Sequence, residues 1–288
     1  MISLAASILA RTAFAVAIPR YDHVVVAILE NQDPGDIIGS SAAPYINDLA
    51  AQGAYFSQSF ALVHPSQPNY IALFSGSTQG VDDDSCPHDF GDTENLAHQL
   101  LGAGFSFAGY SEDLPSVGYT GCASGGYVRK HNPWVDFGNV PAAGNQPWTA
   151  FPSDYSQLPT FSFVIPNLCN DMHDCPIATG DAWLHDHLDA YVQWAKTHNS
   201  LFVLTWDEDR FTSVNRIVTI FAGAGVAPGT YATRIDHYSV LRTFEVMYGL
   251  DCLGNAASAS AITAIWGDGE TIFADGFDHR IDVCAAAN

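Results

Sequence analysis

The stretch HVVVAIL at residues 23–29, followed at once by Glu30 and Asn31, decides the fold. An apolar run without alternation is typical of a strand that is buried on both faces of a parallel sheet. Similar strand patterns occur at 105–110, 160–165, 201–206 and 216–221. Helical patterns alternate with these strands, at 43–53, 68–75, 95–103, 181–196 and 237–248. The alternation predicts an α/β fold with a mostly parallel central sheet and helices on both faces.

The composition and the charge exclude several classes of protein. The chain has 288 residues, of which 48% are hydrophobic and 14% are charged, a balance opposite to that of a disordered chain. Ten basic residues face 31 acidic ones, so the formal net charge is -21. This charge excludes nucleic-acid binding through a basic surface and opposes binding to anionic lipid. An anionic substrate would also be repelled, unless a bound cation reverses the local field.

The ends of the chain suggest a division into three parts. Residues 1–17 are apolar and small and end in Ala-x-Ala patterns, which predicts a signal peptide; a docked N-terminal helix is the alternative. We expect a catalytic domain over 18–251 and a C-terminal extension, 252–288, packed on the same domain. No stretch reaches the roughly 18 apolar residues of a membrane span, so we expect no stable membrane anchor. These features predict a secreted or periplasmic protein.

The even number of cysteines fits an exported protein, in which thiols form disulfides. The sequence alone allows many pairings. Buried free thiols are the alternative, whereas a zinc cluster is disfavoured because no CxxC pair occurs. Cys169 and Cys175 are close enough in sequence to close one loop, so we expect them to form a bridge. Cys252 and Cys284 flank the C-terminal segment and form the second expected bridge. The two cysteines that remain give Cys86–Cys122.

Polar side chains follow three of the expected strands near the points where these strands end. The groups are Glu30 with Asn31, Asp171 with His173, and the acidic run Asp207-Glu208-Asp209. Ligand sites in such sheets lie at the carboxyl ends of the strands, so we expect these groups to converge. Converging carboxylates repel one another unless a cation lies between them, and carboxylate and amide oxygens suit a hard divalent ion. The alternative is that they are solvated loop acids of a very acidic protein.

Ser66 lies just before the helix expected at 68–75. Free N–H groups and the dipole at a helix N-terminus favour an anion, and they help a hydroxyl to lose its proton. Asn69, one turn further on, could hydrogen-bond the same anion. The alternative is that Ser66 is only an N-cap, which is a common role for serine.

Basic residues and histidines are few enough to be considered singly. His173 is expected to contact a metal or a phosphate, and His237, which opens the last helix, could face the same cleft. Lys130 and His131 follow Arg129 in a long excursion, residues 111–158, that is rich in Gly, Pro, Ser and aromatics. They are candidates for contacts to an anionic substrate. Pairing of these cations with surface acids is the alternative.

At these positions the sequence resembles the bacterial phosphoesterase family, which contains acid phosphatases and phosphatidylcholine-type phospholipases C within the alkaline-phosphatase-like superfamily. The resemblance spans roughly residues 22 to 250, through the segments 24–31, 64–70, 74–80, 166–174 and 205–209. It implies a hydroxyl nucleophile bound to one divalent metal ion, whose identity among Ca, Mg, Mn, Fe and Zn stays open.

The resemblance also implies roles for individual residues. Ser66 matches the nucleophile, and the matched metal ligands are Glu30, Asn31, Ser66, Asp207 and Glu208. Asn69 matches an amide that holds a phosphoryl oxygen. His173 matches a histidine that contacts the phosphoryl group, with Asp171 as its neighbour, and His237 is a second candidate acid for the leaving oxygen. Residues 209–212, Asp-Arg-Phe-Thr, depart from the pattern, in which a further acid and then glycines are expected, so substrate choice near this loop is open.

We therefore expect a secreted, metal-dependent phosphoric-ester hydrolase of the acid phosphatase type, which acts on a small phosphate ester through a phosphoserine intermediate. Phospholipase C or a phosphodiesterase on the same fold is the alternative, although the chain is short for the phospholipases. A sulfatase is disfavoured because Asn69 stands where the arginine of a Cys/Ser-x-Pro-x-Arg motif would be. The second alternative is a non-catalytic secreted binding protein. The sequence does not indicate an oligomeric state.

Overall fold

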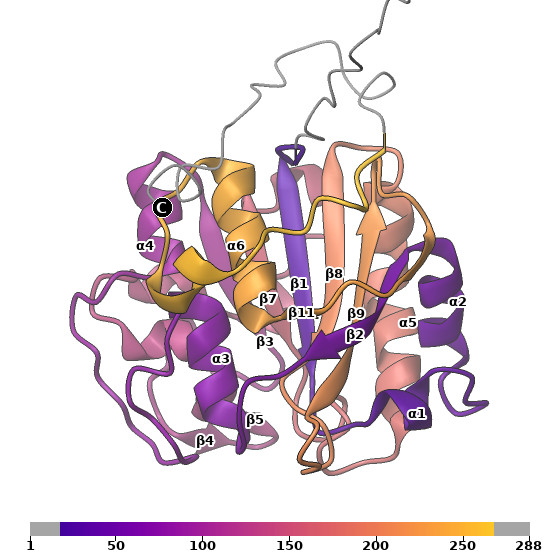
Figure 1. Ribbon diagram of the computed structural model, residues 1–288. Coiled ribbons are helices and arrows are strands. Elements are labelled where there is room, and N and C mark those ends of the chain that lie inside the picture. The colour runs from indigo at the N-terminus through magenta and orange to yellow at the C-terminus, as the bar shows by residue number, and fades with distance from the viewer. Residues whose placement is uncertain (1–17, 268–288) are drawn as a thin grey trace, which may run out of the picture.

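The computed structural model of the protein describes residues 18–267. The predicted signal peptide and residues 268–288, which include Cys284, lie outside the described residues. A nine-stranded sheet crosses the molecule between two layers of helices (Figure 1). The prediction of an α/β fold with helices on both faces of a central sheet is confirmed.

The large sheet has the strand order β10-β2-β9-β8-β1-β7-β3-β6, and β11 pairs with β2. Its strands are β1 (His23–Leu29), β2 (Ala54–Phe60), β3 (Phe107–Ser111), β6 (Asn145–Pro147), β7 (Phe161–Ile165), β8 (Ser200–Trp206), β9 (Arg216–Gly223), β10 (Gly229–Tyr231) and β11 (Ile235–Asp236). A small hairpin pairs β4 (Ala123–Ser124) with β5 (Tyr127–Val128). In the large sheet β9 is antiparallel to both β8 and β2, whereas the other neighbours pair in parallel. The sheet is mostly parallel, as predicted.

The α-helices of the described chain are α1 (Pro34–Ile37), α2 (Pro44–Gln52), α3 (Ser66–Ser75), α4 (Leu96–Gly102), α5 (Ile177–Ala195) and α6 (His237–Tyr248). Short 3-10 helices are η1 (Arg129–His131), η2 (Pro133–Asp136), η3 (Ala142–Gly144), η4 (Trp148–Ala150), η5 (Tyr155–Gln157) and η6 (Gly254–Ser258). One boundary difference matters for the site. Helix α3 begins at Ser66 rather than at Pro68, so Ser66 is part of its first turn.

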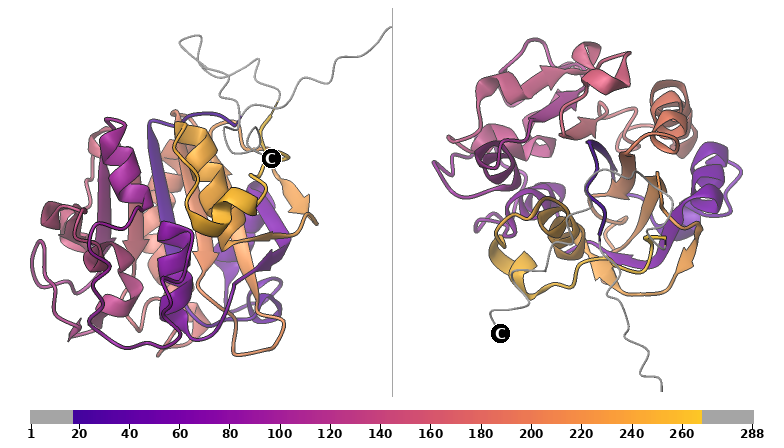
Figure 2. Two further views of the ribbon diagram at one scale, coloured as in Figure 1. Left: turned by 60° about the vertical axis from the view of Figure 1, so that its left-hand side comes forward. Right: turned by 90° about the horizontal axis from the view of Figure 1, so that it is seen from above.

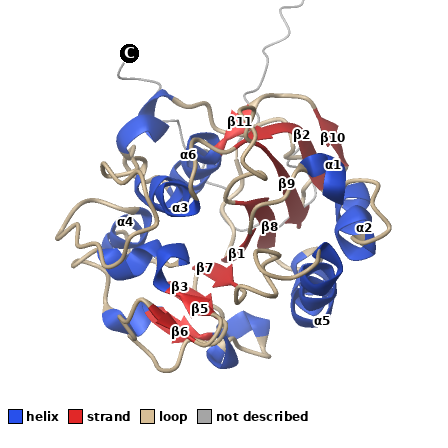
Figure 3. Ribbon diagram, turned by 90° about the horizontal axis from the view of Figure 1, so that it is seen from below, coloured by secondary structure: helices blue, strands red, loops and turns tan. Residues whose placement is uncertain are grey.

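Strand β1 is apolar throughout because both of its faces are buried. Its even-numbered residues, from Val24 to Ile28, belong to a hydrophobic core shared with α3, α4 and α6. Its odd-numbered residues, from Val25 to Leu29, belong to a second core shared with α1, α2 and α5. Figure 3 shows these two groups of helices on opposite sides of the strands.

The ends of the strands place the polar groups of the site. Strands β1, β7 and β8 are parallel neighbours, so their carboxyl ends meet at one edge of the sheet, the lower edge in Figure 1. Helices α3 and α6 lie side by side over one face of this sheet, as the two further views in Figure 2 show. Glu30 and Asp207 follow β1 and β8 directly at this edge.

Two disulfides cross-link loops of the described chain. Cys86 is bonded to Cys122, and Cys169 is bonded to Cys175, so two of the three predicted bridges are confirmed. The third predicted bridge, Cys252–Cys284, reaches outside the described residues.

Residues 252–267, the described part of the predicted C-terminal extension, pack against the body of the protein. Leu253, Ile262 and Trp266 belong to the same core as α3 and α6. The Trp266 indole also donates a hydrogen bond to the Ile262 carbonyl at 2.7 Å. Within residues 18–267, no helix combines the length and the apolar character that crossing a membrane requires.

Candidate active site

Ser66 lies where strand ends and a helix start converge. Its hydroxyl is within hydrogen-bond distance of two carboxylates, 3.1 Å from Glu30 Oε2 and 3.2 Å from Glu208 Oε1. Pro65 occupies the N-cap position of α3, and no side chain caps that helix end. Ser66 is therefore not an N-cap: its oxygen faces the carboxylates instead of the backbone of its own helix.

The carboxylates around Ser66 are buried and crowded. Burial raises the pKa of Glu30 well above its usual range, and the neighbouring Asp207 and Asp171 raise it further. Burial also raises the pKa of Asp207 to about 6 and that of Glu208 to about 7. These acids resist carrying full negative charge together in a site from which water is excluded. A cation bound among them would remove that penalty.

Unpaired buried oxygens test whether the expected ligands fit a metal ion. Asn31 Oδ1, Asp207 Oδ2 and Asp171 Oδ2 are buried and have no hydrogen-bond partner in the described chain. Asn31 has a left-handed backbone, with φ at 51°, which asparagine tolerates, and its N–H donates to Asp207 Oδ1 at 3.3 Å. Buried polar groups are normally satisfied, so clustered oxygens without partners fit a divalent cation as the missing partner.

His131 lies deeper than its predicted role as a substrate contact suggested. Its Nε2 is 3.1 Å from Glu30 Oε1, its Nδ1 is 3.6 Å from Asp171 Oδ2, and the side chain is 1% exposed. Burial lowers the pKa of His131 well below its usual range and so favours the neutral ring. Glu30, His131 and Asp171 offer ligand atoms within 4.8 Å of one another and could also hold a metal ion.

Tyr70 is a residue of the site that sequence reasoning missed. Its hydroxyl donates to Glu30 Oε1 at 2.5 Å, and its ring stacks on His131 with centroids 4.9 Å apart. Tyr70 is one helical turn from Ser66 on α3, a position that could have suggested its direction. The contact fixes one oxygen of Glu30 while the other oxygen faces Ser66.

Lys130 pairs with an acid, yet it remains close to the site. Its Nζ is 2.6 Å from Asp84 Oδ2, and the other oxygen of Asp84 accepts from the Gln67 N–H, in the first turn of α3, at 2.9 Å. Burial lowers the pKa of Lys130, but the Asp84 hydrogen bond and the charges of Glu30 and Asp207 outweigh this effect and raise the pKa overall. Lys130 is therefore a fixed cation beside the helix that carries Ser66.

Arg129, the neighbour of Lys130 in sequence, does not join the site. Its guanidinium binds Asp136 Oδ1 through Nε at 2.9 Å and through Nη2 at 2.7 Å, and it donates to the Thr120, His88 and Val135 carbonyls. These contacts hold the excursion together. Of the two adjacent cations, only Lys130 is available to an anion bound near Ser66.

The Asp171–His173 loop is held in an unusual backbone conformation. Met172 has φ at 80°, and Asp171 Oδ1 accepts from the His173 N–H at 2.8 Å. Gly180 of α5 leaves room for this loop, because a Cβ there would lie 2.5 Å from Met172 Cγ and 2.8 Å from the Asn170 carbonyl oxygen. The imidazole of His173 is 31% exposed and uses Nδ1 to bind Asp174 Oδ1 at 2.7 Å. His173 therefore reaches the solvent side of the site, next to its predicted neighbour Asp171.

The structure places His237 at the site, but in a buried position. Its Nε2 is 2.8 Å from the Asp207 carbonyl oxygen, which can only accept, so Nε2 carries the proton. Burial lowers the pKa of His237, and its Nδ1 has no hydrogen-bond partner in the described chain. This geometry suits a residue that positions the Asp207 backbone, whereas His173 is better placed to contact a substrate.

The Asn69 amide is used by the loop that precedes Ser66. Asn69 Oδ1 accepts from the Leu62 and Val63 N–H groups at 3.0 and 3.2 Å, and Nδ2 donates to the Val63 and Pro65 carbonyls at 2.8 and 3.2 Å. Asn69 thus shapes the approach to Ser66. Its predicted contact with a phosphoryl oxygen stays a prediction.

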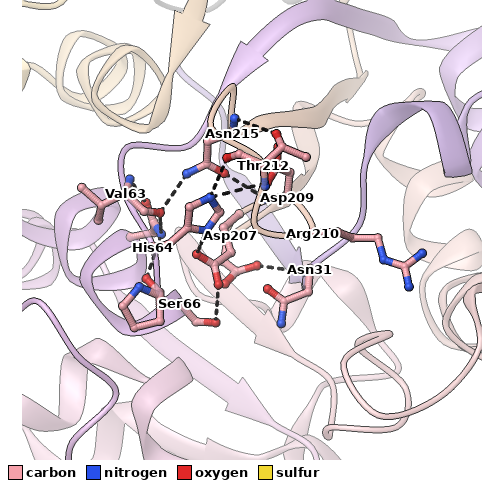
Figure 4. A network of polar contacts seen from close by, with 12 residues as sticks. Asn31, Val63, His64, Ser66, Asp207, Asp209, Arg210, Thr212 and Asn215 are labelled. Carbon is pink, nitrogen blue, oxygen red and sulfur yellow. Dashed lines mark hydrogen bonds and ion pairs between the residues drawn. The ribbon is translucent and has the colours of Figure 1, made fainter.

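His64 is a second residue that sequence reasoning did not assign, although it lies inside the segment 64–70 that carried the resemblance. Its Nδ1 is 2.5 Å from Glu208 Oε2, and its Nε2 donates to the Thr212 carbonyl at 3.1 Å (Figure 4). The Asn215 amide donates to the Val63 carbonyl at 2.8 Å. The loop before Ser66 and the loop after Asp209 are therefore tied together beside Glu208.

The fold and the site together define a class of protein: hydrolases with an alkaline-phosphatase-like sheet, a hydroxyl at a helix start and acids at the neighbouring strand ends. Among solved structures, a protein of the alkaline phosphatase superfamily from Vibrio parahaemolyticus shares this fold, with a TM-score of 0.59 at 12% identity over 86% of this chain and 72% of that one. A phosphonate monoester hydrolase of Agrobacterium radiobacter shares it with a TM-score of 0.55 at 12% identity, over 88% of this chain and 79% of that one.

The model of the Phosphoesterase family matches residues 39–251, and the chain belongs to this family. It is 54% identical to a phosphatidylinositol-3-phosphatase of Mycobacterium tuberculosis, over 92% of each chain. It is 31% identical to a phosphate-repressible acid phosphatase of Penicillium chrysogenum, over 81% of this chain and 60% of the fungal one. The predicted resemblance is confirmed, and the chain is a phosphoric-ester hydrolase.

Proposed function

We propose that the protein is a secreted, metal-dependent phosphomonoesterase of the acid phosphatase type that acts through a phosphoserine intermediate. The observation that carries the proposal is the Ser66 hydroxyl, which lies 3.1 Å from Glu30 and 3.2 Å from Glu208 at the start of α3. The relatives named as phosphatases support the substrate class. Two disulfides are consistent with an oxidising compartment. The catalytic unit would be residues 18–251, with the extension packed on it.

The residues that would hold the divalent ion are Glu30, Asn31, Ser66, Asp207 and Glu208. The ion would neutralise the buried acids, lower the pKa of the Ser66 hydroxyl and attract the phosphate dianion to an acidic protein. Carboxylate and amide oxygens suit a hard ion, and calcium, magnesium, manganese, iron and zinc all remain candidates.

The protein's own residues can be assigned to the two chemical steps. Ser66 Oγ attacks phosphorus and gives its proton to a neighbouring carboxylate, and the O–P bond to the leaving alcohol breaks in line. His173 donates a proton to the leaving oxygen. A water molecule then attacks the phosphoserine and gives a proton back to His173, and the Ser66 oxygen leaves with the proton returned by the same carboxylate. Lys130 and the first N–H groups of α3 stabilise the charge on the phosphoryl oxygens.

The test compares three esters: p-nitrophenyl phosphate, bis(p-nitrophenyl) phosphate and p-nitrophenyl sulfate, each with and without a chelator. We expect chelator-sensitive hydrolysis of the monoester, little of the diester and none of the sulfate. Acid quenching during turnover of a radiolabelled monoester should trap label on Ser66. Preferred cleavage of the diester would indicate the alternative, a phosphodiesterase or a phospholipase C. Failure to cleave any ester with metal present would favour a non-catalytic binding protein.

A further inference from the structure

Glu112 is an acid at the edge of the sheet that carries the site, and the chemistry at Ser66 does not use it. It follows β3 directly, as Glu30 follows β1 and Asp207 follows β8 at the same edge. Glu112 is half-buried, and its carboxylate binds loop and helix residues instead of facing Ser66. The donors that it binds therefore indicate its role.

The carboxylate of Glu112 accepts hydrogen bonds from both sides of one loop. Its Oε2 accepts from the Asn167 N–H at 3.0 Å, and the Asn170 amide lies 3.0 Å from Oε1 and 2.9 Å from Oε2. Its Oε1 also accepts from the indole N–H of Trp183, on α5, at 3.1 Å. These donors lie before and after His173 in the chain, so one carboxylate joins the two sides of the loop that carries this histidine.

The loop passes this anchoring on to His173 through its own hydrogen bonds. The Asn167 carbonyl accepts from the Asp171 N–H at 2.8 Å, and Asp171 Oδ1 accepts from the His173 N–H at 2.8 Å. Asp174 engages Nδ1 of the His173 ring at 2.7 Å, which leaves Nε2 for a leaving oxygen. A displacement of Asn167 would therefore also displace the nitrogen that donates the proton.

The next residue, Asp113, fixes the same loop against the hairpin that leads to Lys130. Asp113 Oδ2 accepts from the Asn167 amide at 3.0 Å and from the Gly126 N–H at 3.2 Å. The Gly126 carbonyl accepts from the Leu168 N–H at 3.0 Å, and a Cβ at Gly126 would lie 2.8 Å from Asn167 Cβ. Gly126 lies between β4 and β5, shortly before Lys130. The end of β3 thus holds the loop of the proton donor against the hairpin that leads to the cation beside α3.

We propose that Glu112 is a positioning residue for proton transfer: it holds the loop 167–173 so that His173 reaches the leaving oxygen. The inference rests on the proposed function, in which His173 protonates that oxygen. General acid catalysis accelerates a step by about 10²–10⁴-fold, and a displacement of about 1 Å can forfeit about a hundredfold. Because the acid acts on the leaving group, the loss should grow with the basicity of that group. A residue that only stabilises the loop would affect good and poor leaving groups alike.

The experiment compares two soluble monoesters, phenyl phosphate and p-nitrophenyl phosphate, by kcat/KM, which reports the steps up to departure of the phenol. Phenolate is the more basic leaving group and needs the proton, whereas p-nitrophenolate leaves readily without it. Glu112→Gln keeps the size of the side chain but replaces one acceptor oxygen with a donor. It should lower kcat/KM for phenyl phosphate by about tenfold and that for p-nitrophenyl phosphate by less than about twofold.

Three further variants complete the comparison. His173→Asn is the reference and should show the same selective loss, by about a hundredfold. The double variant Glu112→Gln/His173→Asn should be no more selective than His173→Asn alone, because Glu112 acts through His173. The matched control is Asp154→Asn, which changes an acid that accepts two hydrogen bonds from Ser156 in another loop, and it should leave the ratio of the two kcat/KM values unchanged. If Glu112→Gln does not fold, Asn170→Ala removes one of its donors and should show the same selectivity.

The outcomes separate this inference from the proposed function. Equal losses on both esters in Glu112→Gln overturn the inference, and so do effects of Glu112→Gln and His173→Asn that multiply in the double variant; phosphatase activity stands in either case. An unselective loss in His173→Asn overturns the assignment of the proton donor together with this inference, while phosphatase activity again stands. If wild-type protein with a divalent ion hydrolyses neither ester, the proposed function itself fails and the inference fails with it.

Discussion

Replacing Ser66 with alanine separates a nucleophile from a merely structural serine. The hydroxyl can donate to one buried carboxylate at a time, and such a bond is worth about 1.5–3 kcal/mol. Alanine recovers roughly 0.5 kcal/mol through its better helix propensity at this position in α3. The free energy of unfolding should therefore fall by about 1–2.5 kcal/mol, which lowers Tm by about 2–4 °C per kcal/mol.

The effect of the same substitution on turnover should be far larger. Loss of a nucleophile removes the covalent route altogether, so kcat for p-nitrophenyl phosphate should fall at least about a thousandfold, or about 4 kcal/mol in barrier. The assay pairs a melting curve with kcat on the same preparation. Ser75→Ala is the matched control, since Ser75 is a buried serine at the other end of α3 that hydrogen-bonds the Ile71 carbonyl. If Ser66→Ala kept more than about a tenth of wild-type kcat, the covalent mechanism would be refuted.

Further predictions concern charge, metal and disulfides. Asp84→Asn should raise KM for the monoester more than it lowers kcat, because Lys130 loses the anion that holds it; a change confined to Tm would contradict this. Burial raises the pKa of Asp207 to about 6 and that of Glu208 to about 7, so the metal-free protein binds extra protons on folding. Its Tm should fall as pH rises from about 4 to about 7, and a divalent ion should restore it at neutral pH; a flat profile in chelator would argue against the buried acid cluster. Replacing both Cys169 and Cys175 with serine should lower kcat clearly while Tm changes little, since the bridge closes the loop that carries His173. A kcat equal to that of the wild type would contradict this role of the bridge.

Strong local patterns made much of the fold predictable. The unbroken apolar run of β1 indicated burial on both faces, and the two hydrophobic cores on either side of it confirm this. Strand β2, Ala54–Phe60, gave no such pattern, because polar Ser57 and Gln58 interrupt it where its pairing with β9 is irregular. Its existence depends on partners distant in sequence.

Residues of the site could be predicted where an acidic side chain directly follows an apolar strand. Carboxylates directly after buried strands pointed to Glu30 and Asp207. The partners of these acids could not be identified in the same way, because Tyr70 and His64 act through contacts that only the folded chain creates. The burial of His131 between two carboxylates was likewise invisible in a loop rich in polar residues.

The bridge between Cys86 and Cys122 makes the surroundings of Lys130, the cation beside α3, depend on the redox state of two thiols. Asp84 is two residues before Cys86, and Lys130 follows Cys122 within the excursion 111–158. In a reducing cytosol the two segments lack this covalent link, and the ion pair beside α3 must form without it. Reduction of this bridge should therefore leave Asp84 and Lys130 less firmly positioned beside the helix that carries Ser66.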